Sequence, residues 1–283
     1  MAAMDDRPPS SPWPRRLAAG LLAAPFVAYG VACALLYVNQ RKVLYTPVPR
    51  GNLDVPTMPL AEGNADVLVS IRPHDGPRAV VYFGGKSEDV SLNVPALGEA
   101  FPDTAIYALH YRGFGGSAGT PDEAGLVADA LALFDTVRRR HPDIIVVGRS
   151  LGSGVAIQVA AKRRARRLVL VTPYDSIADV AARHFPAFPA RWILQDRYLS
   201  WHVAPHIRTP TTVITAEHDA VIPLSHTERL LAHFQPGVAH AVMLAGEDHG
   251  SFLHKPAYFE ALRMVPPRRH RGAGDRLQDE SAA

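Results

Sequence analysis

A single cysteine, Cys33, excludes any disulfide bond within this chain of 283 residues, so cysteine pairing says nothing about its redox compartment. The chain also has little excess of positive over negative charge. The net charge is only +3 and the arginines are scattered except for three short clusters, which argues against nucleic-acid binding. No internal repeat is apparent. The 47% hydrophobic and 20% charged residues argue against a fibrous or wholly disordered chain and suit one large α/β domain.

Charged residues are missing altogether from residues 17–38, and this gap predicts a transmembrane helix. As a helix the segment would span about 33 Å, whereas the hydrocarbon core of a bilayer is about 30 Å thick. A pair of basic residues lies near each end, which indicates an anchor and leaves its orientation open. The alternative is a cleaved signal peptide, although its apolar region usually covers only about 7 to 15 residues. We expect an uncleaved single-pass membrane anchor at residues 17–38, after an N-terminal tail at 1–16.

Beyond the anchor, a proline-rich stretch predicts a juxtamembrane connector at residues 39–65, and short apolar runs then alternate with helical patterns. Apolar, β-branched runs are typical of a parallel sheet buried on both faces, so we expect a doubly wound α/β domain at residues 66–265. Strands are predicted at 66–72, 79–83, 105–110, 144–147, 167–171, 212–216 and 239–244, and helices at 122–140, 154–162, 224–234 and 256–264. Residues 266–283 are polar and charged, and we expect a disordered tail there.

One interval interrupts the alternation, because about 175–208 separates two predicted strands by more than a single helix. It predicts a small helical cap inserted into the domain. The interval is rich in aromatic residues: Phe185, Phe188, Trp192, Tyr198 and Trp201. These side chains are expected either to pack on the sheet or to line an acyl-binding pocket.

The best-defined motif is GRSLG at residues 148–152, where an apolar run gives way to a helical pattern. A strand that turns sharply into a helix strains the backbone of the central serine and demands small residues two positions to either side. This context predicts Ser150 as the nucleophile of a serine hydrolase. The sequence GGSAG at residues 115–119 satisfies the same pattern, but it lies in a Gly- and Pro-rich stretch without a preceding apolar run. We interpret that second match as a loop.

A serine hydroxyl is a poor nucleophile at neutral pH and needs a base to accept its proton and an acid to orient that base. Of thirteen histidines, His249 is the predicted base, because it follows the last predicted strand, where a loop can reach the carboxyl edge of the sheet. Asp219 follows the preceding strand and is the predicted acid. The resulting order of Ser150, Asp219 and His249 is the order that α/β-hydrolases show along the chain. Asp175, which follows another strand, remains the alternative acid.

The oxyanion that develops on a substrate carbonyl needs backbone N–H donors. One donor is expected from Leu151, the residue after the nucleophile, at the positive end of its helix. The other is expected from the loop after the strand at 79–83, where paired glycines let a backbone amide approach the substrate closely. We nominate Gly85 and Lys86 in that loop.

Two further patterns are rejected as cofactor sites. The sequence GGKS at residues 84–87 lacks the first glycine of a nucleotide-binding loop. His202 and His206 are four residues apart, but a proline lies between them and no acidic or cysteine ligand is patterned nearby. We therefore expect neither a metal nor another cofactor.

These residues resemble the membrane-anchored α/β-hydrolase-domain serine hydrolases, relatives of the serine aminopeptidase and dienelactone hydrolase groups. The resemblance runs from about residue 40 to residue 259. It is carried by segments 82–85, 110–117, 148–152, 172–176 and 219–223 and by His249. It implies an α/β-hydrolase fold and hydrolysis of an ester, thioester or amide through an acyl-enzyme. The usual oxyanion loop of this family has histidine and often asparagine where this chain has Gly84 and Lys86.

We expect a membrane-tethered hydrolase of carboxylic esters or thioesters. Its acyl substrate is expected to be lipid-like, because the anchor would hold the enzyme near lipids. A serine peptidase or amidase of the same fold is the nearest alternative. A different class of function is a catalytically silent scaffold that presents a hydrolase-shaped surface to a membrane partner, which the departures at Gly84 and Lys86 permit. The sequence leaves the oligomeric state open.

Overall fold

The computed structural model describes residues 13–60 and 66–265, and of residues 13–21 it describes the backbone only. The tails expected at 1–16 and 266–283 lie outside these residues, apart from 13–16, which begin the first helix. The chain divides into two units, residues 1–40 and residues 41–283.

Helix α1, Trp13–Leu44, makes up the described part of the first unit, and its last residues belong to the second. Its segment Leu22–Leu44 has a mean hydropathy of 1.7, and its most apolar stretch contains no buried residue, so by length and composition it is able to cross a membrane. Signal sequences near an N-terminus share this property. The helix continues past residue 38, the expected end of the span, because neither proline nor glycine follows before Pro47.

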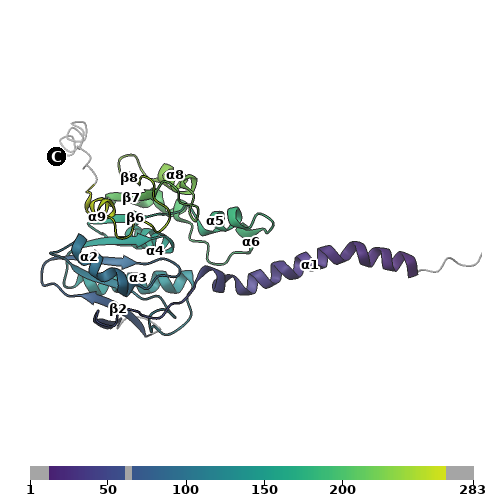
Figure 1. Ribbon diagram of the computed structural model, residues 1–283, viewed down its shortest axis with the longest axis horizontal. Helices are drawn as coiled ribbons and strands as arrows, with labels where there is room; N and C mark the ends of the chain where they lie inside the picture. Colours follow the sequence, from purple (N-terminus) through teal and green to yellow (C-terminus); the bar gives the residue numbers. More distant parts are fainter. Residues whose placement is uncertain (1–12, 61–65, 266–283) are drawn as a thin grey trace, which may run out of the picture. The chain divides into compact units, whose positions relative to one another are not determined.

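The second unit is built on an eight-stranded sheet with the order β1-β2-β4-β3-β5-β6-β7-β8 (Figure 1). The strands are β1 (Thr57–Leu60), β2 (Val67–Arg72), β3 (Arg78–Phe83), β4 (Ala105–Leu109), β5 (Asp143–Arg149), β6 (Arg167–Val171), β7 (Thr211–Ala216) and β8 (Ala239–Leu244). Strands β1 and β2 run antiparallel to their neighbours, and all other pairs are parallel. Every predicted strand is present. The edge strand β1 was not predicted and lies within the segment expected to be a connector.

Helices connect the parallel strands, as the alternation of patterns predicts. They are α2 (Val94–Ala100), α3 (Glu123–Arg138), α4 (Leu151–Lys162), α5 (Ile177–His184), α6 (Ala190–Ile193), α7 (Ser200–Val203), α8 (Leu224–His233) and α9 (Pro256–Arg263), with short 3₁₀ turns η1 (Val90–Asn93) and η2 (Ala204–His206). Local chemistry fixes several starts. The carboxylate of Asp122 accepts the Gly125 N–H at the beginning of α3, and the Ser176 hydroxyl accepts the Asp179 N–H at the beginning of α5. Helix α2 was not predicted.

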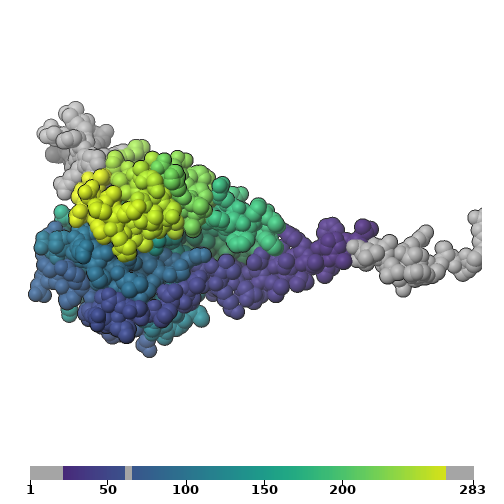
Figure 2. Space-filling view, in the orientation of Figure 1, coloured from purple at the N-terminus to yellow at the C-terminus, as the bar shows by residue number. Residues whose placement is uncertain are grey.

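Two separate hydrophobic clusters cover the two faces of the sheet. Apolar residues of α3, α4 and α8 belong to one cluster, which includes Leu133, Val155 and Leu230. Residues of α2 and α9 belong to the other, which includes Leu97 and Tyr258. In Figure 2 the yellow C-terminal segment that contains α9 lies against the blue segment that contains α2. Because helices bury both faces, the central strands are mostly apolar, and β4 and β6 are buried along their whole length.

The segment that follows α1 is built into the second unit. The hydroxyl of Tyr45, a buried residue, lies 3.0 Å from the hydroxyl of Tyr198. The Thr46 N–H donates to the Lys86 carbonyl at 2.9 Å, and the Val48 carbonyl accepts an N–H from the loop after β4. These contacts and β1 make residues 45–48 and 57–60 of the expected connector part of the folded unit.

The interval expected to form a cap holds four short helical segments between β6 and β7, namely α5, α6, α7 and η2. Among its aromatic residues, Tyr198 is buried in the core. Phe185, Trp192 and Trp201 are instead 45%, 89% and 37% exposed. The Trp201 ring lies 5.7 Å from the ring of His233 on α8. Packing in the core therefore accounts for Tyr198, whereas Trp192 faces solvent.

Candidate active site

Ser150 stands at the turn from β5 into α4 with φ of 50° and ψ of −118°, a strained backbone conformation for a residue with a side chain. Its N–H donates to the Val171 carbonyl at 2.9 Å, which helps to hold the turn. A Cβ atom at Gly148 would lie 2.3 Å from the Gly152 carbonyl oxygen, and one at Gly152 would lie 2.1 Å from the Phe83 carbonyl oxygen. The close approach of strand and helix thus requires both glycines.

The serine of the second, rejected match has a structural role in the loop after β4. The buried Ser117 hydroxyl accepts the Leu68 N–H at 2.9 Å and donates to the His110 carbonyl at 2.9 Å. No histidine ring among the described hydrogen bonds contacts this hydroxyl. The loop interpretation of residues 115–119 is therefore consistent with the structure.

The structure brings together Ser150, His249 and Asp219 at the carboxyl edge of the sheet. The Ser150 Oγ lies 3.0 Å from His249 Nε2, and His249 Nδ1 lies 2.7 Å from Asp219 Oδ2. The second oxygen of Asp219 accepts the N–H groups of Val221 and Ile222 at 2.9 and 2.7 Å. These bonds hold the carboxylate so that it accepts the Nδ1 proton of His249, which leaves Nε2 free to accept the serine proton.

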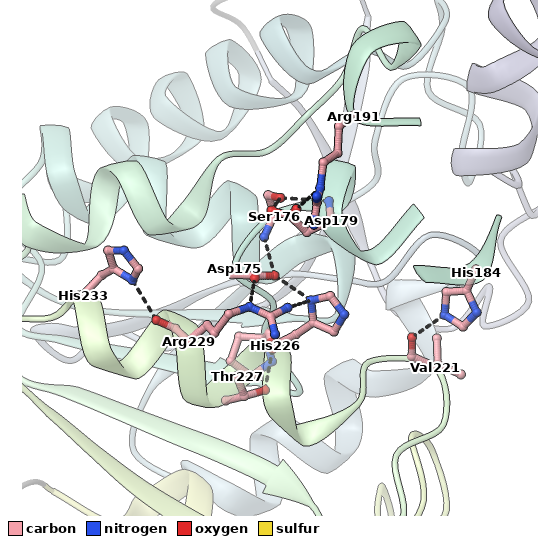
Figure 3. Close-up of polar contacts among 11 residues, drawn as sticks. Asp175, Ser176, Asp179, His184, Arg191, Val221, His226, Thr227, Arg229 and His233 are labelled. Carbon is pink, nitrogen blue, oxygen red and sulfur yellow. Dashed lines mark hydrogen bonds and ion pairs between the residues drawn. The ribbon is translucent and has the colours of Figure 1, made fainter. Parts of the chain in front are cut away.

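Asp175, the alternative acid, lies in a different cluster (Figure 3). Its Oδ1 is 2.7 Å from His226 Nδ1, and its Oδ2 accepts the Nε–H of Arg229 at 2.6 Å. Burial opposes ionisation of this carboxyl, but the hydrogen bonds from His226 and Arg229 lower its pKa below the ordinary value. No described hydrogen bond joins Asp175 to His249. The geometry therefore favours Asp219 as the partner of His249.

Of the three backbone donors nominated for the oxyanion, one is already engaged. The Gly85 N–H donates to Glu88 Oε2 at 2.7 Å, so the expectation that Gly85 serves the substrate is revised. Within residues 13–60 and 66–265, the N–H groups of Leu151 and Lys86 have no hydrogen-bond acceptor. A Cβ atom built at Gly85 would lie 3.6 Å from Ser150 Cβ, so this loop borders the nucleophile directly. Leu151 and Lys86 remain the nominated donors.

The described part of the chain contains no cluster of three or more His, Cys, Asp or Glu side chains suited to a metal ion. His202 lies on α7 and His206 on η2, next to the aromatic residues of the cap interval.

Comparison with known proteins places this fold in a family. The family described as "Serine aminopeptidase, S33" matches residues 77–203. An uncharacterized protein of Mycobacterium tuberculosis (strain ATCC 25618 / H37Rv) is 32% identical over 229 residues, covering 73% of this chain and 79% of that protein. The chain belongs to the α/β-hydrolase family. This result confirms the predicted relationship to the serine aminopeptidase group.

This α/β hydrolase is also similar to a lipase in sequence and to a solved structure in fold. The lysophosphatidylserine lipase ABHD12 of Macaca fascicularis is 31% identical over 153 residues, which cover 46% of this chain and 38% of that protein. The structure of Est1E from Butyrivibrio proteoclasticus with ferulic acid bound matches with a TM-score of 0.61 at 14% identity. That match covers 80% of this chain and 100% of the Est1E chain. At such low identity the structural likeness shows the fold alone, and it confirms the predicted α/β-hydrolase fold.

Two charged residues beside the site of this α/β hydrolase were not predicted. Glu88 and Arg149 form an ion pair of 2.6 Å, and their side chains are only 9% and 12% exposed. The Arg149 guanidinium also donates to the His249 carbonyl at 3.2 Å. Burial opposes the charge of Arg149, but the adjacent Glu88 carboxylate raises its pKa above the ordinary value. The signal available in the sequence was an arginine inside the GRSLG motif, directly before the nucleophile.

Proposed function

We propose that this protein is a membrane-anchored serine hydrolase that cleaves carboxylic esters or thioesters through an acyl-enzyme. Ser150 acts as the nucleophile, His249 as the general base and Asp219 as the acid that orients it. The single observation that carries the proposal is the continuous hydrogen-bonded row from Ser150 Oγ through the His249 ring to Asp219. Such a row is the arrangement that converts a serine hydroxyl into a nucleophile.

The proposed reaction proceeds in two halves. His249 Nε2 accepts the hydroxyl proton as Ser150 Oγ attacks the carbonyl carbon, and Asp219 stabilises the imidazolium that forms. The N–H groups of Leu151 and Lys86 donate to the oxyanion of the tetrahedral intermediate. The intermediate collapses as His249 returns its proton to the leaving alcohol or thiol, which leaves an acyl ester on Ser150. A water molecule, activated by His249 in the same way, then attacks this acyl ester and releases the carboxylic acid. These steps require neither a metal nor another cofactor.

The proposed organisation is an anchor in α1, a connecting segment and a catalytic unit whose cap lies at about 175–208. Support for the anchor comes from the apolar segment Leu22–Leu44, and support for a lipid-like acyl substrate comes from the lipase relative. Extraction of membranes with alkaline carbonate tests the anchor. The full chain is expected in the membrane pellet, and its release into the soluble fraction would contradict an uncleaved anchor.

A serine-directed probe and one substitution test the catalytic assignment. A fluorophosphonate is expected to label the full-length protein at Ser150, because only an activated serine reacts quickly. Ser150→Ala is expected to lose labelling and to lower p-nitrophenyl ester hydrolysis on the order of a million-fold, or about 8 kcal/mol in the activation free energy. Ser117→Ala removes the serine of the second GxSxG match and serves as the control with turnover retained. Undiminished hydrolysis by Ser150→Ala would contradict the assignment.

A serine peptidase is the second candidate, favoured by the description of the matching family as a serine aminopeptidase. Comparing kcat/KM for acyl esters of increasing chain length with kcat/KM for aminoacyl amides separates the two activities. A silent scaffold is the third candidate, and it predicts that Ser150 reacts with the fluorophosphonate no faster than an ordinary serine.

A further inference from the structure

We propose that Arg149 and Glu88 are positioning residues that tie the oxyanion loop and the His249 loop to the nucleophile turn. This inference rests on the proposed hydrolase function and adds to it two residues that do not touch the reacting atoms. The juxtaposition that carries it is a single buried guanidinium located between the loop after β3 and the loop after β8, borne by the residue adjacent to Ser150.

Glu88 forms the end of the network in the oxyanion loop. Its Oε2 accepts the Gly85 N–H at 2.7 Å as well as the Nη1–H of Arg149 at 2.6 Å. Its Oε1 accepts the Tyr82 hydroxyl and, at 2.6 Å, the amide of Asn93. Four donors thus surround one carboxylate, which satisfies a buried charge and fixes the conformation of the loop between β3 and η1. The Gly85 N–H is oriented by this carboxylate, and the next N–H along the chain is the nominated oxyanion donor.

Arg149 forms the other end of the network. While Nη1 binds Glu88, Nη2 donates to the His249 carbonyl at 3.2 Å. Cβ atoms built on Gly85 and Gly250 would lie 3.6 and 3.7 Å from this guanidinium, so both loops border it. Its backbone belongs to the last residue of β5, directly before the strained turn. One side chain therefore relates the position of the base to the positions of the nucleophile and the oxyanion loop.

The geometry of guanidinium suits this role, and that of ammonium does not. The planar fork presents two Nη groups that donate in different directions at once, toward Glu88 and toward the His249 carbonyl. A lysine keeps the charge but offers a single, mobile nitrogen, which cannot hold both partners in this geometry. Arg149→Lys therefore separates the loss of positioning from the loss of charge.

The experiment compares Arg149→Lys with a matched control in the full-length protein. Arg112 and Asp129 form another largely buried pair, with two bonds of 2.8 Å, on the elements that follow β4, and no described hydrogen bond joins their side chains to the triad. Arg112→Lys thus breaks a comparable fork without touching the proposed network. The assays are kcat and KM for a p-nitrophenyl ester and the rate of fluorophosphonate labelling, with thermal unfolding recorded for each variant.

For Arg149→Lys we expect kcat and the labelling rate to fall about 10- to 100-fold, because displacing a catalytic group by about 1 Å costs roughly that much. KM is expected to stay within about threefold, because the network does not contact the substrate. Arg112→Lys is expected to keep kcat within about twofold of wild type. Glu88→Gln is expected to lower kcat as well, and the double variant to lower it no further than the larger single effect, since the two residues act as one unit.

Several outcomes would overturn the inference. It is wrong if Arg149→Lys folds and keeps the wild-type kcat and labelling rate, or if Arg112→Lys lowers kcat as strongly. Strictly multiplicative effects of Arg149→Lys and Glu88→Gln would also contradict a common network. If Arg149→Lys fails to fold, the near-isosteric Glu88→Gln carries the same test. A wild-type protein without labelling or turnover overturns the proposed hydrolase function and this inference together, whereas active wild type with active Arg149→Lys overturns the inference alone.

Discussion

His110 provides a prediction about the stability of the fold that can be worked out from the structure. The side chain is 2% exposed at the end of β4, and its Nε2 lies 2.8 Å from the Ser70 hydroxyl. Burial lowers the pKa of His110 to about 4, while the charges of Asp89 and Arg50 act on it in opposite directions. The folded protein therefore keeps this ring neutral at pH values where the unfolded chain, with an ordinary histidine pKa near 6.5, already binds a proton.

Proton linkage determines how the free energy of unfolding changes with pH. A depressed pKa contributes stability that is present above about pH 6.5 and is lost as the pH falls toward 4, because the unfolded state gains the proton first. Between pH 7 and pH 4.5 the loss attributable to His110 is about 2 kcal/mol in the free energy of unfolding. Carboxylates titrate in the same range, so the comparison must be made against a variant that lacks only this ring.

Urea unfolding at pH 7 and pH 4.5, monitored by tryptophan fluorescence, measures the effect in wild type and in His110→Gln. The variant is expected to lose about 2 kcal/mol less than wild type on acidification, whatever its absolute stability at pH 7. The same substitution at His240, which is exposed, is the matched control and is expected to follow wild type. An equal loss in wild type and His110→Gln would refute the reasoning, because it would mean that the buried ring does not resist protonation.

Two further predictions concern the site. Asp219→Asn is expected to lower kcat about 10⁴-fold by removing the group that fixes the His249 tautomer, whereas Asp175→Asn is expected to keep kcat within about tenfold; the opposite ranking in ester hydrolysis would assign the acid to Asp175. Gly152→Ala is expected to lower the free energy of unfolding by about 3 kcal/mol or more, because its Cβ would collide with the backbone at the end of β3, and an unchanged midpoint in thermal unfolding would contradict that collision.

Most of the sheet could be predicted because each central strand is marked by its own run of apolar residues. Runs such as β4 and β6 are buried on both faces, and their almost entirely apolar character is visible without knowledge of their neighbours. The edge strand β1 was missed because it is only four residues long and contains Pro59, which normally weakens a strand assignment. Helix α2 was missed for a related reason. It is only seven residues long, has a proline in its first turn and shows little helical periodicity of apolar residues.

The nucleophile and the order of the three candidate catalytic residues could be predicted from the sequence, whereas the contacts of the surrounding polar groups could not. The turn around Ser150 has a local steric cause, so the sequence identifies it. The choice between Asp219 and Asp175 depends on contacts with side chains of α8, and the engagement of the Gly85 N–H depends on Glu88 folding back over its own loop. Partnerships of this kind are made by tertiary packing, which no spacing in the sequence reports.

The hydrogen bond from the Thr46 N–H to the Lys86 carbonyl has a practical consequence. The Thr46 N–H donates to the Lys86 carbonyl and so helps to hold the loop whose Lys86 N–H is nominated to meet the substrate. A truncated protein that starts after residue 48 would lack the apolar N-terminal helix. It would also lose this hydrogen bond and the buried Tyr45. Trimming is better stopped ahead of Arg41, whose guanidinium binds Asp196 at 2.9 Å.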